Sequence, residues 1–474
     1  MLGHLIRKEI LDHILGFRFL ILSALAGLVI WLSLYSGYSY YQSCLKDYRL
    51  AQAATEDRLR RIQMAEDWRE IEKIGFHVHK PPTPMNIFVR GLEPVLGRSI
   101  LHPASTNKQA KQSAEAAEPI LGLFPPLDLG LVVQVVLSLF VLLFTYDAVC
   151  GEKEAGTLRL TSSFSVPRDR LLLGKLLGVS IPMHVAFGLP VLLGVGVLLL
   201  MPDVNLTNPE LLRLGLILVT FGLYLTAFAC AGLLASCLTH RAATSFVILL
   251  AFWTGSVIVL PRLSLIVADS LRPAISRHQY TMEIASIRRE LGAENRSLRW
   301  KWRNEHPESA QGNPEAQEAY GVFYRKMSKE LEERYKPRFD RLEQAFTNRY
   351  QNRLNLAVFL ARLSPAFALK NATVRLSGAG VDRQQRFEGA YIRFNGVYLD
   401  WIWGALEDFY RRRFNEAKYG KYKWDVSGMP RFVYQETWTE EDVQIALVDV
   451  GILAVWGLAL FAGAYVTMLR YDLR

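Results

Sequence analysis

Six apolar segments, each nearly free of charge, alternate with polar stretches along the 474-residue chain. A helix crosses a bilayer core of roughly 30 Å with about 20 residues, because each residue rises about 1.5 Å. The segments long enough to do so are residues 17–40, 127–145, 171–200, 211–238, 244–260 and 445–469. This pattern predicts an all-α integral membrane protein with six transmembrane helices.

The charges of the short connections indicate which way the helices cross. If the helices alternate, the basic N-terminus, the Lys- and Arg-rich connection of residues 146–170 and the basic C-terminal tail fall on one side. The short loop opposite them, between the third and fourth spans, carries only acidic charge, in Asp203 and Glu210. Because basic short loops stay in the cytoplasm, we expect cytoplasmic N- and C-termini and two large external segments, residues 41–126 and 261–444.

The beginning of the chain, residues 1–16, has the periodicity of an amphipathic helix. Leu2, Ile6, Ile10 and Ile14 repeat every four residues, and charged side chains lie between them. This arrangement is typical of a helix that lies on a membrane surface. We expect a cytoplasmic interfacial elbow helix here; the alternative is that these residues simply begin the first span.

The second external segment, residues 261–444, is predicted to form a mostly helical domain. Residues 280–304 and 315–354 have apolar side chains at helical spacing, with proline and glycine between them. This pattern predicts a helical hairpin outside the membrane. Pro337 should kink the second helix of the hairpin or begin a new one. A further helix is expected around residues 382–416.

Three polar positions interrupt apolar sequence near the membrane. Residues 354–369 contain Arg362 and Pro365 and are too short to span comfortably, which favours a re-entrant or interfacial helix. Asp449 lies in the last span, where an ionisable side chain is a functional candidate, although a hydrated structural role near the outer interface fits equally well. His184, in the third span, is open to the same two interpretations.

Composition excludes several function classes. The chain is 51% hydrophobic and 21% charged, with a net charge of +10. Basic residues of the long external segment alternate with Glu and Asp, which is typical of a solvated helical surface rather than of a nucleic-acid site. The sequence contains no phosphate loop, zinc-binding pattern or nucleophile elbow. We therefore expect no enzyme activity, no nucleic-acid partner, and neither a cofactor nor a metal on this chain.

The connection between the second and third spans carries the pattern most relevant to function. Residues 147–158 read Asp-Ala-Val-Cys-Gly-Glu-Lys-Glu-Ala-Gly-Thr-Leu, and Pro167 closes the connection. This sequence predicts a short, charged, amphipathic helix that could sit in a groove of a soluble partner and transmit a push. The alternative is an ordinary loop whose charged residues serve solubility and topology.

This connection resembles the signature of type 2 ABC exporter permeases, the membrane-spanning subunits of ATP-driven transporters. Glu152 is followed by Gly156-Thr157-Leu158, then by Pro167 and by Gly174-Lys175 at the start of the third span. The order of the six spans matches as well. The resemblance implies a coupling helix that contacts a separate ATPase subunit through Glu152, Glu154, Gly156, Thr157, Leu158, Arg159, Pro167 and Arg168. ATP and magnesium would then be bound by the ATPase and not by this chain.

The size of the two external segments departs from the basic members of that family. A subfamily with a large external insertion before the last transmembrane helix is more similar, and Leu363-Ser364-Pro365-Ala366 matches its pattern. The resemblance implies a subunit that couples ATP hydrolysis to export across the bacterial cytoplasmic (inner) membrane. Its implied partners are an ABC ATPase dimer, a second copy or a related permease chain, and the lipid bilayer.

Two other functions fit the same sequence. The chain could be a mechanotransmitting ABC subunit that acts on a periplasmic partner through residues 280–354, without a cargo channel. It could also be a membrane-anchored assembly or receptor protein with no ATPase. In that case the connection between the second and third spans would be dispensable.

Overall fold

The computed structural model describes residues 2–64, 76–102, 126–158, 167–273, 276–307, 314–413, 428–434 and 440–470. The chain divides into two compact units. Unit 1 consists of Met1–Val259, Arg362–Arg412 and Tyr419–Arg474, and unit 2 consists of Leu260–Ala361 and Arg413–Lys418.

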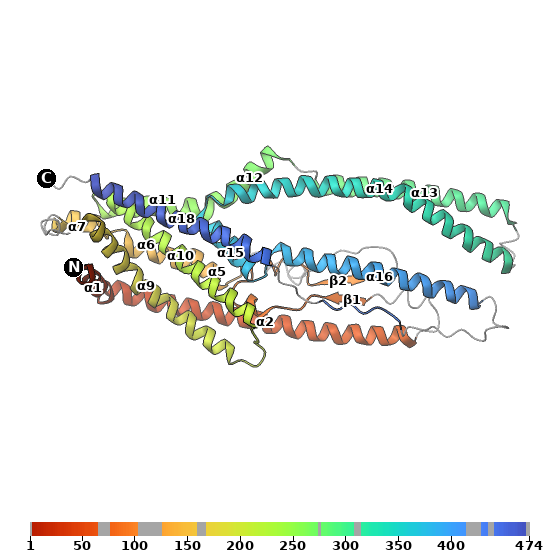
Figure 1. Ribbon diagram of the computed structural model, residues 1–474, viewed down its shortest axis with the longest axis horizontal. Helices are drawn as coiled ribbons and strands as arrows, with labels where there is room; N and C mark the ends of the chain where they lie inside the picture. Colours follow the sequence, from red (N-terminus) through yellow and green to blue (C-terminus); the bar gives the residue numbers. More distant parts are fainter. Residues whose placement is uncertain are drawn as a thin grey trace. The chain divides into compact units, whose positions relative to one another are not determined.

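Unit 1 is a helical bundle with one small pair of strands (Figure 1). Its elements are, in chain order, α1 (Leu2–Ile14), α2 (Phe17–Met64), β1 (Phe76–His79), η1 (Pro84–Ile87), β2 (Ser99–His102), α5 (Leu129–Leu131), η3 (Val132–Leu137), α6 (Ser138–Thr145), α7 (Cys150–Glu154), α9 (Arg168–Leu199), α10 (Asn208–Leu238), α11 (Ala242–Thr254), η4 (Gly255–Val259), α15 (Pro365–Leu376), α16 (Val381–Arg413) and α18 (Glu440–Arg470). The strands pair antiparallel, with Phe76 opposite His102.

Six helical stretches among the described residues are long and apolar enough to cross a membrane. They are Phe17–Arg61, Leu129–Glu154, Arg168–Leu199, Asn208–Leu238, Ala242–Leu271 and Glu440–Arg470. The predicted fold class, an all-α membrane protein with six spans, is therefore confirmed. The side of the membrane on which the termini lie stays a prediction.

Two helices continue well beyond the apolar segments that predict them. Helix α2 runs without interruption to Met64, because residues 41–64 contain neither proline nor glycine and are rich in helix-favouring side chains. Helix α11 continues through the π-helical turn η4 into α12 (Leu260–Leu271). Both helices therefore extend past the bilayer length that a span requires.

Helix α10 lies at the centre of unit 1. It packs against α6, α9, α11, α15 and α18, and its small residues allow a close approach of these helices. A Cβ added at Gly232 would lie 1.8 Å from the Thr145 hydroxyl oxygen of α6, and one at Gly457 of α18 would lie 3.9 Å from the Ala227 Cα. The core of the bundle thus depends on side chains that are small enough to let helix backbones meet.

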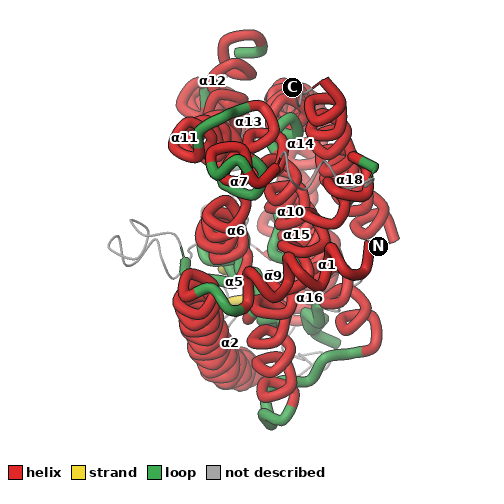
Figure 2. The backbone as a smooth tube through the Cα atoms, turned by 90° about the vertical axis from the view of Figure 1, so that its left-hand side faces the viewer, coloured by secondary structure: helices red, strands yellow, loops and turns green. Residues whose placement is uncertain are grey.

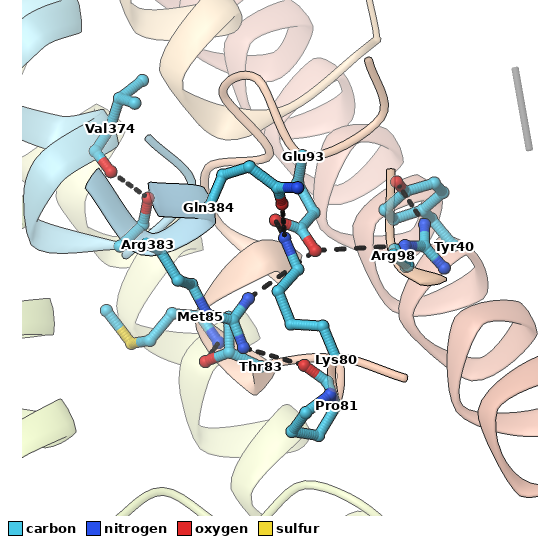
Figure 3. A network of polar contacts seen from close by, with 11 residues as sticks. Tyr40, Lys80, Pro81, Thr83, Met85, Glu93, Arg98, Val374, Arg383 and Gln384 are labelled. Atoms are coloured by element: carbon cyan, nitrogen blue, oxygen red, sulfur yellow. Dashed lines mark hydrogen bonds and ion pairs between the residues drawn. The ribbon is translucent and has the colours of Figure 1, made fainter. Parts of the chain in front are cut away.

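A buried network of charges fastens the segment between β1 and β2 to helix α16 (Figure 3). The Lys80 ammonium donates to Glu93 at 3.1 Å and to Gln384 of α16 at 3.0 Å. Arg383 of α16 donates to the Pro81 carbonyl oxygen at 2.8 Å. Burial lowers the pKa of Lys80 to about 8, and the Glu93 carboxylate opposes that shift. Lys80 is therefore still protonated at neutral pH and can hold the carboxylate.

Unit 2 contains α12, α13 (Arg277–Glu305) and α14 (Pro314–Ala361) in its described part. Helices α13 and α14 pack as an antiparallel pair around a core that includes Ile287, Met327 and Leu331 (Figure 1). Arg338 of α14 pairs with Glu290 of α13 at 2.7 Å. Helix α14 continues through Pro337, so of the two outcomes expected at that proline, a new helix is the wrong one.

The close contact between α2 and η1 predicts the effect of a larger side chain at Gly37 on stability. An added Cβ at this position would lie 2.0 Å from the Ile87 carbonyl oxygen, and a backbone atom cannot rotate away. We expect Gly37→Ala to destabilise the folded protein by about 1–3 kcal/mol through overpacking. Thermal unfolding of the protein in lipid nanodiscs measures this effect.

Gly196→Ala is the matched control, because no described atom lies within 4 Å of a Cβ at that helical glycine. Alanine there should leave stability unchanged or raise it by up to about 1 kcal/mol. Equal unfolding midpoints for the two variants would contradict the close contact between α2 and η1.

Candidate functional site

The predicted coupling segment lies at the same end of unit 1 as α1 and the last turn of α18 (Figure 1). Its helix α7 begins against α10, where the backbone N–H groups of Val149 and Cys150 donate to the Ser236 hydroxyl at 2.8 and 2.9 Å. The first N–H groups of a helix have no partner within the helix. Ser236 is fully buried and supplies that acceptor, so α7 is anchored to α10 at its start.

Lys153 makes a second attachment to α10. Its ammonium donates to the carbonyl oxygens of Cys237 and Thr239, at 2.5 and 2.9 Å. The last carbonyl groups of a helix lack intrahelical donors and carry partial negative charge. A lysine at this position therefore satisfies the end of α10 and holds α7 beside it.

Glu152 is bound through a buried lysine to two other helices. The Lys175 ammonium of α9 donates to Glu152 at 2.7 Å and to Glu9 of α1 at 3.2 Å. The exposed fractions of these side chains are 3% for Lys175, 11% for Glu9 and 21% for Glu152. One cation thus joins α1, α7 and α9. It holds both carboxylates in place, so that neither side chain turns toward the solvent.

Helix α1 packs along α9 (Figure 2). Glycines of α9 at this contact allow the close approach. A Cβ added at Gly178 would lie 2.3 Å from the Glu9 Cβ, and one at Gly174 would lie 3.4 Å from the Leu5 Cβ. These glycines let the Glu9 carboxylate reach Lys175 across the helix interface. The amphipathic helix expected at the N-terminus therefore packs into the bundle along α9 with a charged residue facing inward.

The far end of the segment is attached to the last helix. The Arg168 guanidinium donates to the carbonyl oxygens of Met468 and Leu469, at 2.9 and 2.7 Å, in the last turn of α18. Leu158 is 1% exposed and belongs to a cluster with Leu172 of α9 and residues of α10 and α18. A cation on the final carbonyls of a helix is favourable for the same reason as at α10.

Between these attachments the segment presents an exposed tip, residues 154–157, which we call the coupling tip. Gly156 has φ = +72°, a left-handed conformation that costs little only for glycine, and this residue ends the short helix α7. No described atom lies within 4 Å of a Cβ at Gly156, so the tip is open. A force applied to it would pass directly to the helices that hold its base.

The eight residues predicted to contact an ATPase fall into distinct environments. Exposed in the coupling tip are Glu154, Gly156 and Thr157. Directed inward to the bundle are Glu152, Leu158 and Arg168. Pro167 is exposed and precedes the first turn of α9, and Arg159 lies outside the described residues. Whether any of them touches an ATPase stays a prediction.

The residues that hold the coupling segment from outside it could not be predicted from the sequence of the segment itself. Glu9 and Ser236 lie 143 and 84 positions away from Glu152 in the chain, counted as 152 − 9 and 236 − 152. Glu9 lies on the apolar side of an amphipathic helix, and a charged residue at such a position indicates a buried ion pair. The local sequence does not indicate which residue pairs with Glu9.

At the opposite end of the last span, Asp449 is paired rather than hydrated. It is fully buried and accepts from Arg362 Nε at 2.7 Å and from Asn371 Nδ2 at 2.7 Å. Ser364 caps helix α15 by accepting from Phe367 N–H, and its hydroxyl donates to the Ser256 carbonyl of η4. A short buried helix, α15, is thereby fixed against the spans that precede and follow the long insertion.

His184 occupies a polar contact between α9 and α10. Its Nδ1 lies 2.7 Å from the Ser180 carbonyl oxygen, and its Nε2 lies 3.1 Å from that of Gly222 and 3.3 Å from the Thr226 hydroxyl. A neutral imidazole can donate to only one carbonyl at a time. Of the two interpretations, these contacts favour the structural one.

The sequence profile of the ABC-2 family transporter proteins matches residues 4–473. The chain belongs to this family. It is thus a permease, the multi-pass membrane subunit of an ABC transporter, and the resemblance based on the coupling segment is confirmed across nearly the whole chain. No curated protein matches the permease.

We expect the buried Lys175 to contribute to the stability of the permease. Lys175→Met leaves Glu9 and Glu152 facing each other without a cation, and removing one member of a buried ion pair costs about 3–5 kcal/mol. We expect a lower unfolding midpoint in nanodiscs. The triple variant Glu9→Gln, Glu152→Gln, Lys175→Met should recover most of the loss, because no buried charge is left unpaired. A midpoint of Lys175→Met equal to that of the wild type would contradict the triad.

Proposed function

We propose that the permease couples ATP hydrolysis by a separate ATPase subunit to the export of a substrate, with the coupling tip as the contact surface. The permease carries no catalytic residues in this proposal; ATP and magnesium are bound by the ATPase dimer. A second permease copy or a related chain completes the transporter in the bacterial inner membrane. The positive charge of the short loops supports a cytoplasmic position for the coupling tip, where ATP is available.

The observation that carries this proposal is the contrast between an open tip and a fixed base. Helix α7 and its flanking residues are bonded to α1, α9, α10 and α18 by charged or hydroxyl side chains. An ordinary surface loop has no need of buried ions at its base, since burying them costs free energy. A lever that must pass a displacement to several helices requires such attachments.

The proposal is tested with the permease reconstituted in nanodiscs together with its ABC ATPase subunit. We expect the double variant Glu154→Ala, Thr157→Ala to reduce permease-dependent ATP hydrolysis about tenfold, or about 1.4 kcal/mol of coupling. Both side chains are exposed, so protein yield and unfolding should be unchanged. The rate of phosphate release is the measurement.

The matched control is Asp169→Ala, Arg170→Ala, two exposed residues in the first turn of α9 outside the coupling tip. This control should retain ATP hydrolysis within about twofold, since most exposed substitutions have small effects. Undiminished ATP hydrolysis in the tip variant would contradict the assignment of residues 154–157 as the contact with the ATPase.

One observation favours mechanotransmission as a second candidate function. The last residue of α14, Ala361, is followed directly by Arg362, which is paired with the buried Asp449 of α18. A movement of the last span would therefore act on Arg362, the first residue after the external hairpin.

Deleting residues 280–354 separates the two functions. Loss of an external partner complex with ATP hydrolysis retained would favour mechanotransmission, and loss of cargo export with no such complex would favour the exporter.

A further inference from the structure

Helices α12 and α14 leave a groove between them in unit 2. Its volume is about 350 Å³, at the lower end of the range of about 300–1,000 Å³ that is typical of ligand pockets. Its buried part includes Ala268 of α12 and Ala357 of α14, which are 0% and 3% exposed. These short side chains let the two helices pack together without filling the space beside them.

Most of the surface that lines the groove is apolar. Leu265 and Ile266 of α12 line it and are 58% and 63% exposed, and Leu354 lines it from the side of α14. Removing apolar surface from water is favourable. The groove therefore favours an apolar occupant over water.

A charged rim accompanies this apolar surface. Asp269 and Arg353 line the groove and pair at 2.7 Å, and their side chains are 63% and 33% exposed. The Arg353 guanidinium also lies 5.5 Å from the centre of the Tyr350 ring, which holds it at the groove. Arg272 lies close by, since its Nη1 donates to the Asn352 carbonyl oxygen at 3.3 Å. A guanidinium has five N–H donors, so this rim can bind a further anionic group.

The depth of the groove in the membrane follows from the fifth candidate span, Ala242–Leu271, which includes the α12 side of the groove. Residues 242–261 carry no charge and are bracketed by Arg241 and Arg262. At about 1.5 Å per residue these 20 residues cover about 30 Å, the thickness of the hydrocarbon core. Residues 265–269 follow about 6–12 Å farther along the helix. They therefore lie at the level of the lipid headgroups and their outer boundary.

We propose that the groove between α12 and α14 binds a zwitterionic phospholipid of the surrounding bilayer. The acyl chain lies along Leu265, Ile266 and Leu354. The headgroup meets the charged rim at Asp269 and Arg353. Along α12 the apolar residues of the groove come before the charged one, so apolar surface and charge follow each other in the same order as in the lipid.

The charges of the rim favour a headgroup with both signs of charge. A phosphate is complementary to the guanidinium groups of Arg353 and Arg272, because arginine binds phosphate through two parallel hydrogen bonds. An amine is complementary to the Asp269 carboxylate. A headgroup with negative charge alone would leave that carboxylate facing a like charge.

The test uses the full-length permease in nanodiscs that contain a small fraction of phosphatidylethanolamine with a photoreactive diazirine on its acyl chain. Illumination attaches the lipid to nearby residues, and mass spectrometry of the peptides measures where it is attached. Val185 and Leu189 of α9 are 59% and 55% exposed and report ordinary contact with the bilayer. We expect peptides from α12 and from residues 350–357 to be labelled several-fold more strongly than those of α9.

Filling the groove should remove this excess. We expect Ile266→Trp to reduce labelling of the groove peptides about fivefold, because the indole occupies the space of the acyl chain. Leu271→Trp is the matched control: Leu271 is 66% exposed on the same helix and is not among the residues that line the groove. It should leave labelling within about twofold, and the unfolding midpoints of both variants should equal that of the wild type.

A second probe, phosphatidylglycerol with the same diazirine, tests the headgroup. The wild type should be labelled more strongly by the phosphatidylethanolamine probe. Asp269→Asn should abolish that preference, because the amine loses its carboxylate and Arg353 is released to bind an anionic lipid. Ser270→Ala, at the exposed neighbouring position, should retain the preference.

Three results would overturn the inference. Groove peptides labelled no more strongly than those of α9 would show ordinary bilayer contact only. Equal loss of labelling in Ile266→Trp and Leu271→Trp would contradict the groove as the site. Equal labelling by the two probes would contradict a zwitterionic headgroup. None of these measurements involves the ATPase, so failure of the coupling proposal and failure of this one can be told apart.

Discussion

The buried ammonium of Lys175 is the contact on which the end of the bundle that carries the coupling segment depends. It holds the carboxylates of Glu9 and Glu152, so helices α1, α7 and α9 share one charge. A lysine placed in an apolar helix has a high cost of desolvation unless acceptors surround it. The need to satisfy that one cation therefore determines where the N-terminal helix packs and how the coupling segment enters the bundle.

The same physical rule applies at the ends of two other helices. Lys153 and Arg168 lie on the final carbonyl groups of α10 and α18, which would otherwise lack donors. The end of a helix keeps its shape when the helix shifts as a rigid body. Hydrogen bonds to such an end can therefore stay intact while the helix is displaced. The coupling tip itself, residues 154–157, is by contrast exposed.

Away from the coupling segment, polar contacts organise each unit separately. In unit 1, the Lys80–Glu93 pair and Arg383 fasten an irregular segment to α16, and Asp449 fixes α15 through Arg362 and Asn371. In unit 2, paired charges along the middle of α13 and α14 stabilise the hairpin. Buried charge here has a structural role in both the loop segment and the last span.

The sequence by itself determined the six spans, the hairpin helices and the position of the coupling segment. Each of these follows from local patterns: apolar length, helical spacing and a short motif within one connection. Helix α2 extended farther than its apolar segment because hydropathy reports the bilayer and not the end of a helix. Pro337 stayed within α14, since antiparallel packing on α13 stabilises the helix on both sides of the proline.

Only the tertiary structure decided which charges meet. Glu9, Glu152 and Lys175 come from three separate helices, and Arg362 reaches Asp449 across 87 positions of the chain. Of the predicted coupling residues, the sequence could not tell Glu152, which is held inside, from Glu154, which is open. Both are acidic and lie two positions apart, and on a helix such neighbours point about 200° apart. The side that faced the bundle was fixed by Lys175, whose position depends on how α9 packs against α1.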